Sequence, residues 1–238
     1  MGQQVGEGVD GSPWQPARFC TDGRKSMTTP LRIDKGDDLI AHAVRLLEAA
    51  VKAKDAISVS KLAAALMLLS GIRTGSLLTG NIAVKEGATS HSILFKERPS
   101  KKAVETPLLC EAKLFANAAN EMKRMQGEYF TPTEADANYK KGIALQLKKM
   151  VKFNGTNSRD PTPGDARWIF IAICYNKHSF QKTGITIQEF ANWVSKSGKH
   201  DTKFPYQEIG VSGKLAIFPE SVRTPLPLEL EKRVARRI

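Results

Sequence analysis

Two arginines stand in segments that could present them to an anion. Arg73 follows a glycine that interrupts an apolar run, in the segment 69–78 (LSGIRTGSLL), and Arg167 begins another apolar run, in the segment 162–170 (TPGDARWIF). A guanidinium group is planar, keeps its charge at neutral pH and can hold two phosphate oxygens at once. Each arginine could equally form a structural ion pair with a carboxylate, so these segments alone leave both interpretations open.

The charge balance of the whole chain favours a polyanionic partner. The 238 residues include 36 Lys and Arg against 24 Asp and Glu, a net charge of +12 at pH 7. The basic residues are spread along the chain, and cationic surfaces bind nucleic acid by releasing counterions from its phosphates. Several lysines decorate the segment 134–151, and we expect most of them to be solvated. A basic protein without such a partner is the alternative interpretation.

The two arginine segments resemble the two signature boxes of tyrosine recombinases and their telomere-resolvase relatives. In the family's first box an arginine lies between a glycine and a Leu-Leu pair, as Arg73 does here. The segment 162–170 is similar to the second box, Thr-Pro-His-Asp-Leu-Arg, with Gly164 where many recombinases have histidine. The run 166–175 (ARWIFIAICY) is similar to the second box of telomere resolvases. The resemblance covers about residues 40–211 and implies that Arg73 and Arg167 stabilise the charge on a scissile phosphate.

The resemblance also implies a lysine, on a small antiparallel sheet, that protonates the leaving 5′ oxygen of DNA. The run 94–108 has the expected strand, basic turn and second strand ending in Pro-Leu. The spacing from Arg73 favours Lys96, whereas alignment of the turn favours Lys101 or Lys102, and the sequence does not decide between them. The alternative is a basic hairpin tip that touches phosphate without taking part in chemistry.

A tyrosine nucleophile is implied downstream of the second box, and Tyr206 is the candidate. The segment 202–211 (TKFPYQEIGV) is similar to the nucleophile segment of telomere resolvases. A phenolate forms a phosphotyrosine reversibly, so no ATP or metal is needed. The family's histidine is assigned to His200, with Lys199 as substitute, although His200 lies six residues before Tyr206 where the family has about nine. A tyrosine packed on the core beside Pro205 is the structural alternative.

The remaining basic and titratable residues receive simpler roles. The lysines of the turn and of the nucleophile segment are expected to contact DNA: Lys102, Lys199 and Lys203. The histidines in segments that the resemblance does not use are expected at the surface: His42, His91 and His178.

The cysteines and the apolar runs indicate the cellular compartment that we expect for the protein. Cys20, Cys110 and Cys174 are far apart and form no Cys-x-x-Cys pair, so we expect reduced thiols and neither a metal nor a cofactor. No stretch reaches the roughly 20 apolar residues that cross a bilayer, and the first residues lack a signal peptide's apolar run. We therefore expect a cytoplasmic, DNA-associated protein with no membrane partner.

Hydrophobic periodicity predicts the elements that carry these residues. Helical spacing begins near Asp37, and Ser58 is expected to cap a second helix that ends at Gly71. Short strands are expected next, with a turn between the last two: 82–84, 92–95 and 104–109, with the turn at 98–100. Helical spacing then returns at 112–125, 134–151, 166–175 and 187–194, and a final amphipathic segment covers 228–238.

These elements predict an α+β fold, a mainly helical domain of the tyrosine-recombinase type with a small antiparallel β-sheet inserted after the second helix. We divide the chain into a flexible arm (1–36), a catalytic domain (37–212) and a basic C-terminal extension (213–238).

The combined features favour an enzyme that cleaves and rejoins DNA strands through a 3′-phosphotyrosine, as in hairpin telomere formation. Its partner would be double-stranded DNA, on which it would self-associate as a dimer or tetramer. One alternative is a site-specific recombinase or integrase. Another is a non-catalytic DNA-binding protein on the same fold, motivated by Gly164 and the short spacing of His200, and charge alone also allows a nucleic-acid coat protein.

Overall fold

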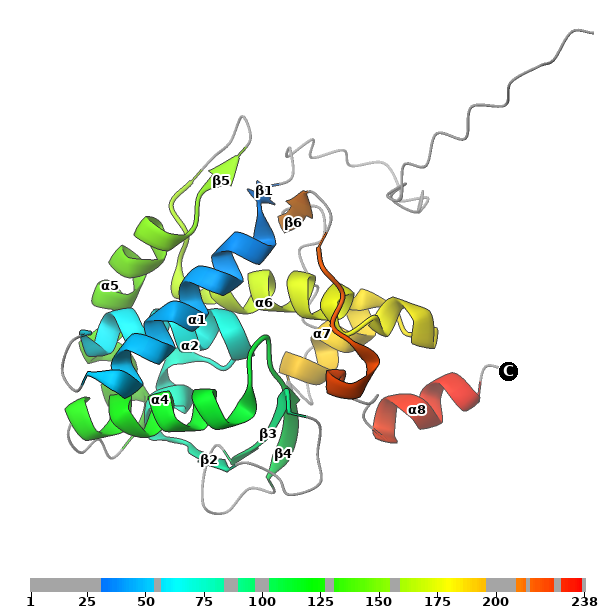
Figure 1. Ribbon diagram of the computed structural model, residues 1–238, viewed down its shortest axis with the longest axis horizontal. Helices are drawn as coiled ribbons and strands as arrows, with labels where there is room; N and C mark the ends of the chain where they lie inside the picture. Colours follow the sequence, from blue (N-terminus) through cyan, green and yellow to red (C-terminus); the bar gives the residue numbers. More distant parts are fainter. Residues whose placement is uncertain are drawn as a thin grey trace, which may run out of the picture.

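The computed structural model describes residues 31–53, 57–83, 90–96, 103–126, 131–154, 159–195, 209–212, 215–224 and 228–236. Figure 1 shows the helices gathered between two small sheets, with a last helix at the side. The elements in chain order are β1 (Leu31–Asp34), α1 (Gly36–Lys52), α2 (Val59–Ser70), α3 (Thr74–Thr79), β2 (Asn81–Ala83), β3 (Ser92–Lys96), β4 (Val104–Pro107), α4 (Ala112–Gln126), α5 (Pro132–Met150), β5 (Phe153–Asn154), α6 (Pro163–Lys177), η1 (Phe180–Thr183), α7 (Ile187–Ser195), β6 (Ile209–Ser212), η2 (Glu220–Val222) and α8 (Leu228–Ala235).

Helix α2 forms the centre of the core. Every residue from Leu62 to Ser70 is buried, and the helix packs against α1, α4, α5 and α6. A helix that is apolar on all sides has to be covered on all sides, which explains this arrangement. The Ser58 side chain caps its start by accepting the Lys61 N–H, and Gly71 ends it at a φ of 65°, as the sequence predicts.

The two sheets lie at opposite ends of the helical core (Figure 1). The antiparallel sheet β2-β3-β4 follows α3 and is the predicted one. The other sheet, in the order β5-β1-β6, was not predicted. Its central strand β1 pairs antiparallel with β5 and parallel with β6, so that Leu31 lies opposite Ile209. A parallel pair needs a long crossover, and nearly the whole helical domain provides it.

The predicted α+β class is therefore confirmed, and the predicted helices form with ends displaced by a few residues. Helices α5 and α6 each begin with a capping box, formed by Thr131 with Glu134 at α5 and by Thr162 with Asp165 at α6. Within the described ranges, no helix has the length and apolar character of a membrane span. The segment 1–30 and the predicted turn 98–100 lie outside the described residues, and the three domain limits stay a prediction.

Candidate functional site

The end of α2, the start of α3 and the first turn of α6 meet at one junction. Arg167, on the first turn of α6, donates a hydrogen bond from Nε to the main-chain carbonyl of Gly71 at 2.8 Å. A β carbon on Gly71 would lie 2.4 Å from the ring of Phe170, so the close contact between the two helices requires glycine there. We refer to Gly71, Arg73 and Arg167 as the arginine junction.

Arg73 enters this junction as the N-cap residue of α3. Its carbonyl accepts the first helical hydrogen bond, from Leu77 N–H at 2.7 Å, and its side chain is exposed. Arg73 lies only two residues beyond Gly71, a span of at most about 7 Å. The two predicted arginines, 94 positions apart in the sequence, are thus anchored to the same turn of the chain.

The start of α6 is fixed by a buried carboxylate. Asp165, 4% exposed, receives two hydrogen bonds from the Arg159 guanidinium, at 2.6 and 2.7 Å, and two from the main-chain N–H and hydroxyl of Thr162, both at 2.7 Å. Burial raises the pKa of this carboxyl, but these donors outweigh burial and leave it below its usual value. Asp165 therefore holds the helix start from which Arg167 projects.

Gly164 departs from the family pattern without a steric reason. A β carbon at this exposed position would meet only the Thr162 Oγ1, at an ordinary contact distance of 3.6 Å. The β carbon of a larger residue is therefore accommodated there.

The predicted general-acid and nucleophile residues are mostly outside the described residues. Lys96 is described: it is half-buried, ends β3 and pairs in register with Asn81, directly after α3. The structure thus brings the Lys96 strand beside the end of α3, the helix that Arg73 begins. The other predicted residues all fall in undescribed segments: Lys101, Lys102, Lys199, His200, Lys203 and Tyr206.

The C-terminal end of α6 carries two buried basic residues that sequence reasoning missed. The prediction of a surface position for His178 was wrong, since this residue is 3% exposed. Its Nδ1 accepts a hydrogen bond from Thr224 N–H at 3.0 Å. The ring proton therefore lies on Nε2 and is donated to the Leu108 carbonyl at 2.9 Å. Burial lowers the pKa of His178 to about 4, so the ring is neutral in the folded chain at neutral pH.

Lys177 completes this second cluster. Its ammonium forms an ion pair with Asp37 at 2.6 Å and donates to the Ala216 carbonyl at 2.9 Å. The segment 215–224 is thereby bound to α6 and to the start of α1. Contacts with this late segment and with Leu108, both distant in the sequence, help to bury the two residues, which is why a local sequence pattern gave no signal for them.

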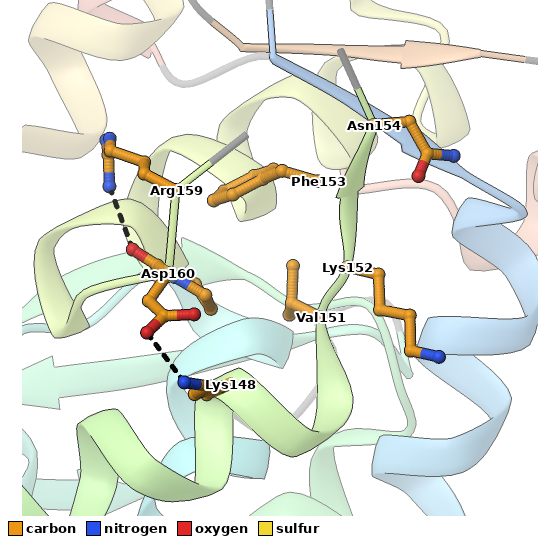
Figure 2. Close-up of a pocket in the computed structure, with 8 residues that line it drawn as sticks. Lys148, Val151, Lys152, Phe153, Asn154, Arg159 and Asp160 are labelled. Atoms are coloured by element: carbon orange, nitrogen blue, oxygen red, sulfur yellow. Dashed lines mark hydrogen bonds and ion pairs between the residues drawn. The ribbon is translucent and has the colours of Figure 1, made fainter. Parts of the chain in front are cut away.

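A basic hollow of about 510 Å³ borders the start of α6 (Figure 2). The ammonium of Lys148 pairs with Asp160 at 2.8 Å, and the Arg159 guanidinium lies over the ring of Phe153. Lys152 contributes a further cation to the lining. In the part of the chain that the structure describes, no group of three or more histidine, cysteine or acidic side chains is placed to hold a metal ion.

The chain, a mainly helical domain with a small antiparallel sheet, has the same fold as solved protelomerase structures. Three of the solved structures that this chain resembles are of the protelomerases TelA and TelK. A TelA protelomerase variant covalently complexed with substrate DNA matches with a TM-score of 0.58 and 12% identity, over 87% of this chain and 64% of that one. The selenomethionine TelA complex with substrate DNA matches with a TM-score of 0.53 and 14% identity, over 87% and 63%.

The protelomerase TelK complexed with substrate DNA matches with a TM-score of 0.51 and 19% identity, over 84% of this chain and 40% of that one. The chain thus spans about three fifths of TelA and two fifths of TelK. No family model matches the sequence, and no curated protein does. At these identities the likeness establishes the fold.

Proposed function

We propose that this protein cleaves and rejoins duplex DNA through a 3′-phosphotyrosine. The observation that carries the proposal is the arginine junction, where Arg167 bonds the turn that leads to Arg73. Solved structures of this fold, TelA and TelK, hold substrate DNA, and three of the TelA complexes are covalent. The net charge of +12 fits the same partner.

The proposed reaction is an in-line exchange at one phosphate. The Tyr206 oxygen forms a bond to phosphorus as the bond to the 5′ oxygen breaks, and a hairpin lysine, Lys96 or Lys101, donates a proton to that leaving oxygen. The phenol proton of Tyr206 passes to solvent, from which the lysine regains its proton. Arg73 and Arg167 stabilise the charge on the non-bridging oxygens, assisted by His200. The reverse attack by a 5′ hydroxyl reseals the strand and frees Tyr206, so no external energy source is needed.

The length of chain between Tyr206 and β6 is compatible with a nucleophile at the arginine junction. Val211 of β6 and Ile173 of α6 both lie beside Gly36, where an added β carbon would contact each of them. Tyr206 precedes Val211 by five residues, which span at most about 18 Å, and Ile173 is about 9 Å along the helix from Arg167. These lengths support Tyr206 as the nucleophile.

A covalent adduct tests the proposal. The chain is incubated with nicked suicide duplexes, from which the strand beyond the cleavage point diffuses away, and a denaturant-resistant protein-DNA product is sought. We expect an adduct with the wild-type chain and none with Tyr206→Phe. An adduct that survives Tyr206→Phe would remove this nucleophile assignment.

The rejoined product distinguishes the two enzymatic versions. We favour hairpin formation, in which each 5′ end attacks the phosphotyrosine of the opposite strand and denatured product migrates as one continuous strand of doubled length. Exchange between two labelled duplexes would instead identify a recombinase. Both reactions cleave the two strands of a duplex, so two copies of the chain bound to one duplex are compatible with either product.

Gly164 motivates a second candidate function, DNA binding without cleavage. In this version the missing imidazole has removed the chemistry and kept the fold. Because the β carbon of a larger residue is accommodated at Gly164, the variant Gly164→His is a direct test. Adduct formation by Gly164→His, with none by the wild type, would favour the non-catalytic version.

A further inference from the structure

The C-terminal half of α5 carries lysines along one exposed face. Lys141, Leu145, Lys148 and Lys149 lie within an arc of about 100° on this helix, and all four are exposed. From Ala137 onwards no acidic residue shares this arc. The sequence suggested solvated lysines scattered over the element, whereas the structure aligns three of them along one side.

The same face leads into the basic hollow beside α6. Lys148 belongs to both, and Lys152 and Arg159 also line the hollow, with the Lys152 side chain projecting to the opposite side of the segment 151–154 from Arg159 (Figure 2). Two carboxylates, Asp160 and Asp165, offset part of the charge. Five basic groups against two acidic ones leave three positive charges in excess on this surface, which we call the α5 track: Lys141, Lys148, Lys149, Lys152 and Arg159.

The α5 track lies away from the arginine junction. Asp165 and Arg167 are two residues apart on α6 and so point in nearly opposite directions. Asp165 binds Arg159 at the hollow, whereas Arg167 binds Gly71 at the junction. A phosphate at the hollow is therefore a different phosphate from one held at the junction.

An exposed leucine in the middle of the track also needs an explanation. Leu145 is 53% exposed and stands between Lys141 and Lys148 on the same arc. The lysines on either side of Leu145 are well solvated in water, whereas exposure of the leucine side chain to water is not favourable. The leucine would gain from contact with the apolar edges of deoxyribose between two phosphates.

We infer that the α5 track binds the phosphate backbone of duplex DNA at a site separate from the arginine junction. The helical part of the track runs about 12 Å from Lys141 to Lys149, at 1.5 Å per residue, and Lys152 lies just beyond the end of α5. One strand of duplex DNA presents a phosphate charge every 3.4 Å or so along its axis, so about four phosphates match the helical part. The inference takes its partner from the proposed function but concerns binding alone.

Salt dependence of binding tests the track. Affinity for a fluorescent duplex is measured across a salt series in the Tyr206→Phe background, so that cleavage does not interfere. The track variant replaces the three lysines without a described carboxylate partner: Lys141→Gln, Lys149→Gln and Lys152→Gln. The slope of log affinity against log salt is negative, and each lost phosphate contact makes it less steep by about 0.9. We therefore expect the magnitude of the slope to fall by about 2 to 3 in the track variant.

A matched control removes the same charge elsewhere. Lys113, Lys182 and Lys232 are exposed on α4, η1 and α8, and their replacement by glutamine is expected to change the slope by less than about 1. In addition, Leu145→Glu should weaken binding more than Leu145→Gln, because the carboxylate repels phosphate.

The outcomes separate the inference from the proposed function. An unchanged slope in the track variant, or an equal decrease in the control, overturns the inference while wild-type adduct formation still supports the proposed function. A wild-type chain that binds no duplex overturns both.

Discussion

The two ends of α6 use basic residues in opposite ways. At the first turn, Arg167 reaches a main-chain carbonyl of the neighbouring helix beside the exposed Arg73. At the last turn, Lys177 and His178 are almost fully buried and bind the segment 215–224. One end directs positive charge outward, where an anion can meet it, and the other uses basic groups to hold the chain together.

This difference shows that residue type alone does not identify a functional group. A buried lysine must be paired to offset its desolvation, and Lys177 has both Asp37 and a carbonyl. A buried histidine must be neutral, and the two hydrogen bonds of His178 fix that state. Changes at the first turn should therefore affect chemistry, and changes at the last turn should affect stability.

The largest expected effect is the loss of adduct formation in Arg167→Ala. Removal of one group that stabilises the transition-state charge lowers the rate about 100 to 1000-fold, and stability falls by only about 1 to 2 kcal/mol through the lost bond to Gly71. Single-turnover adduct formation and urea unfolding measure the two quantities. A rate within tenfold of the wild type would place Arg167 outside the reaction.

At the other end, acid should unfold the protein through His178. Its pKa is about 4 when folded and near 6.5 when unfolded, so the unfolded chain binds the proton more readily between these values. Stability is fully present above about pH 6.5 and falls as the pH is lowered towards 4, by roughly 3 kcal/mol in total.

Urea unfolding at a series of pH values measures this loss. His178→Gln should be less stable at pH 7 and should show a smaller decrease towards acid. His42→Gln, on α1, serves as the matched control and should retain the wild-type pH dependence. An unchanged pH profile in His178→Gln would contradict the assignment.

Asp165→Ala should destabilise the start of α6 by about 2 kcal/mol. The substitution removes half of the capping box and leaves Arg159 without this carboxylate. Asp160→Ala is the matched control, because its ion pair with Lys148 is exposed and contributes less than about 0.5 kcal/mol. Equal losses in the two variants, measured by chemical denaturation, would argue against the buried network.

The smallest effect is expected for Gly164→Ala. The added β carbon finds an ordinary contact, and alanine favours a helix over glycine, so stability should change by between zero and about 1 kcal/mol in favour of the variant. Gly71→Ala is the contrasting change, because its β carbon would collide with Phe170 at a positive φ. A large loss in Gly164→Ala would mean that this position serves more than helix formation.

Local signals predicted most of the fold. The spacing of apolar residues located the helices, and Ser58 and Gly71 marked the two ends of α2 correctly. The sheet β5-β1-β6 escaped prediction because its strands are two to four residues long and pair residues such as Leu31 and Ile209, far apart in the sequence. A short strand without a nearby partner has no periodic pattern to detect.

The candidate site was predictable to a similar degree. The two arginine segments were recognised from the residues around them, and the structure brings both to Gly71. The burial of His178 could not be predicted, because it depends on Thr224, which returns 46 residues later. The roles of all the predicted site residues stay predictions: Arg73, Lys96, Arg167, His200, Tyr206 and the turn lysines.

The pairing of β1 with β6 sets an order of events during synthesis. At about 5 to 20 residues per second, a ribosome needs roughly 10 to 40 s to pass from the first strand to the sixth. Once β5 has been made, β1 can pair with it, but β6, the other neighbour of β1 in the sheet, is still missing. The arginine junction, complete once α6 has emerged, can therefore assemble before β6 is available. A nascent chain would acquire its arginine junction first and its last strand only after the segment with Tyr206 has been made.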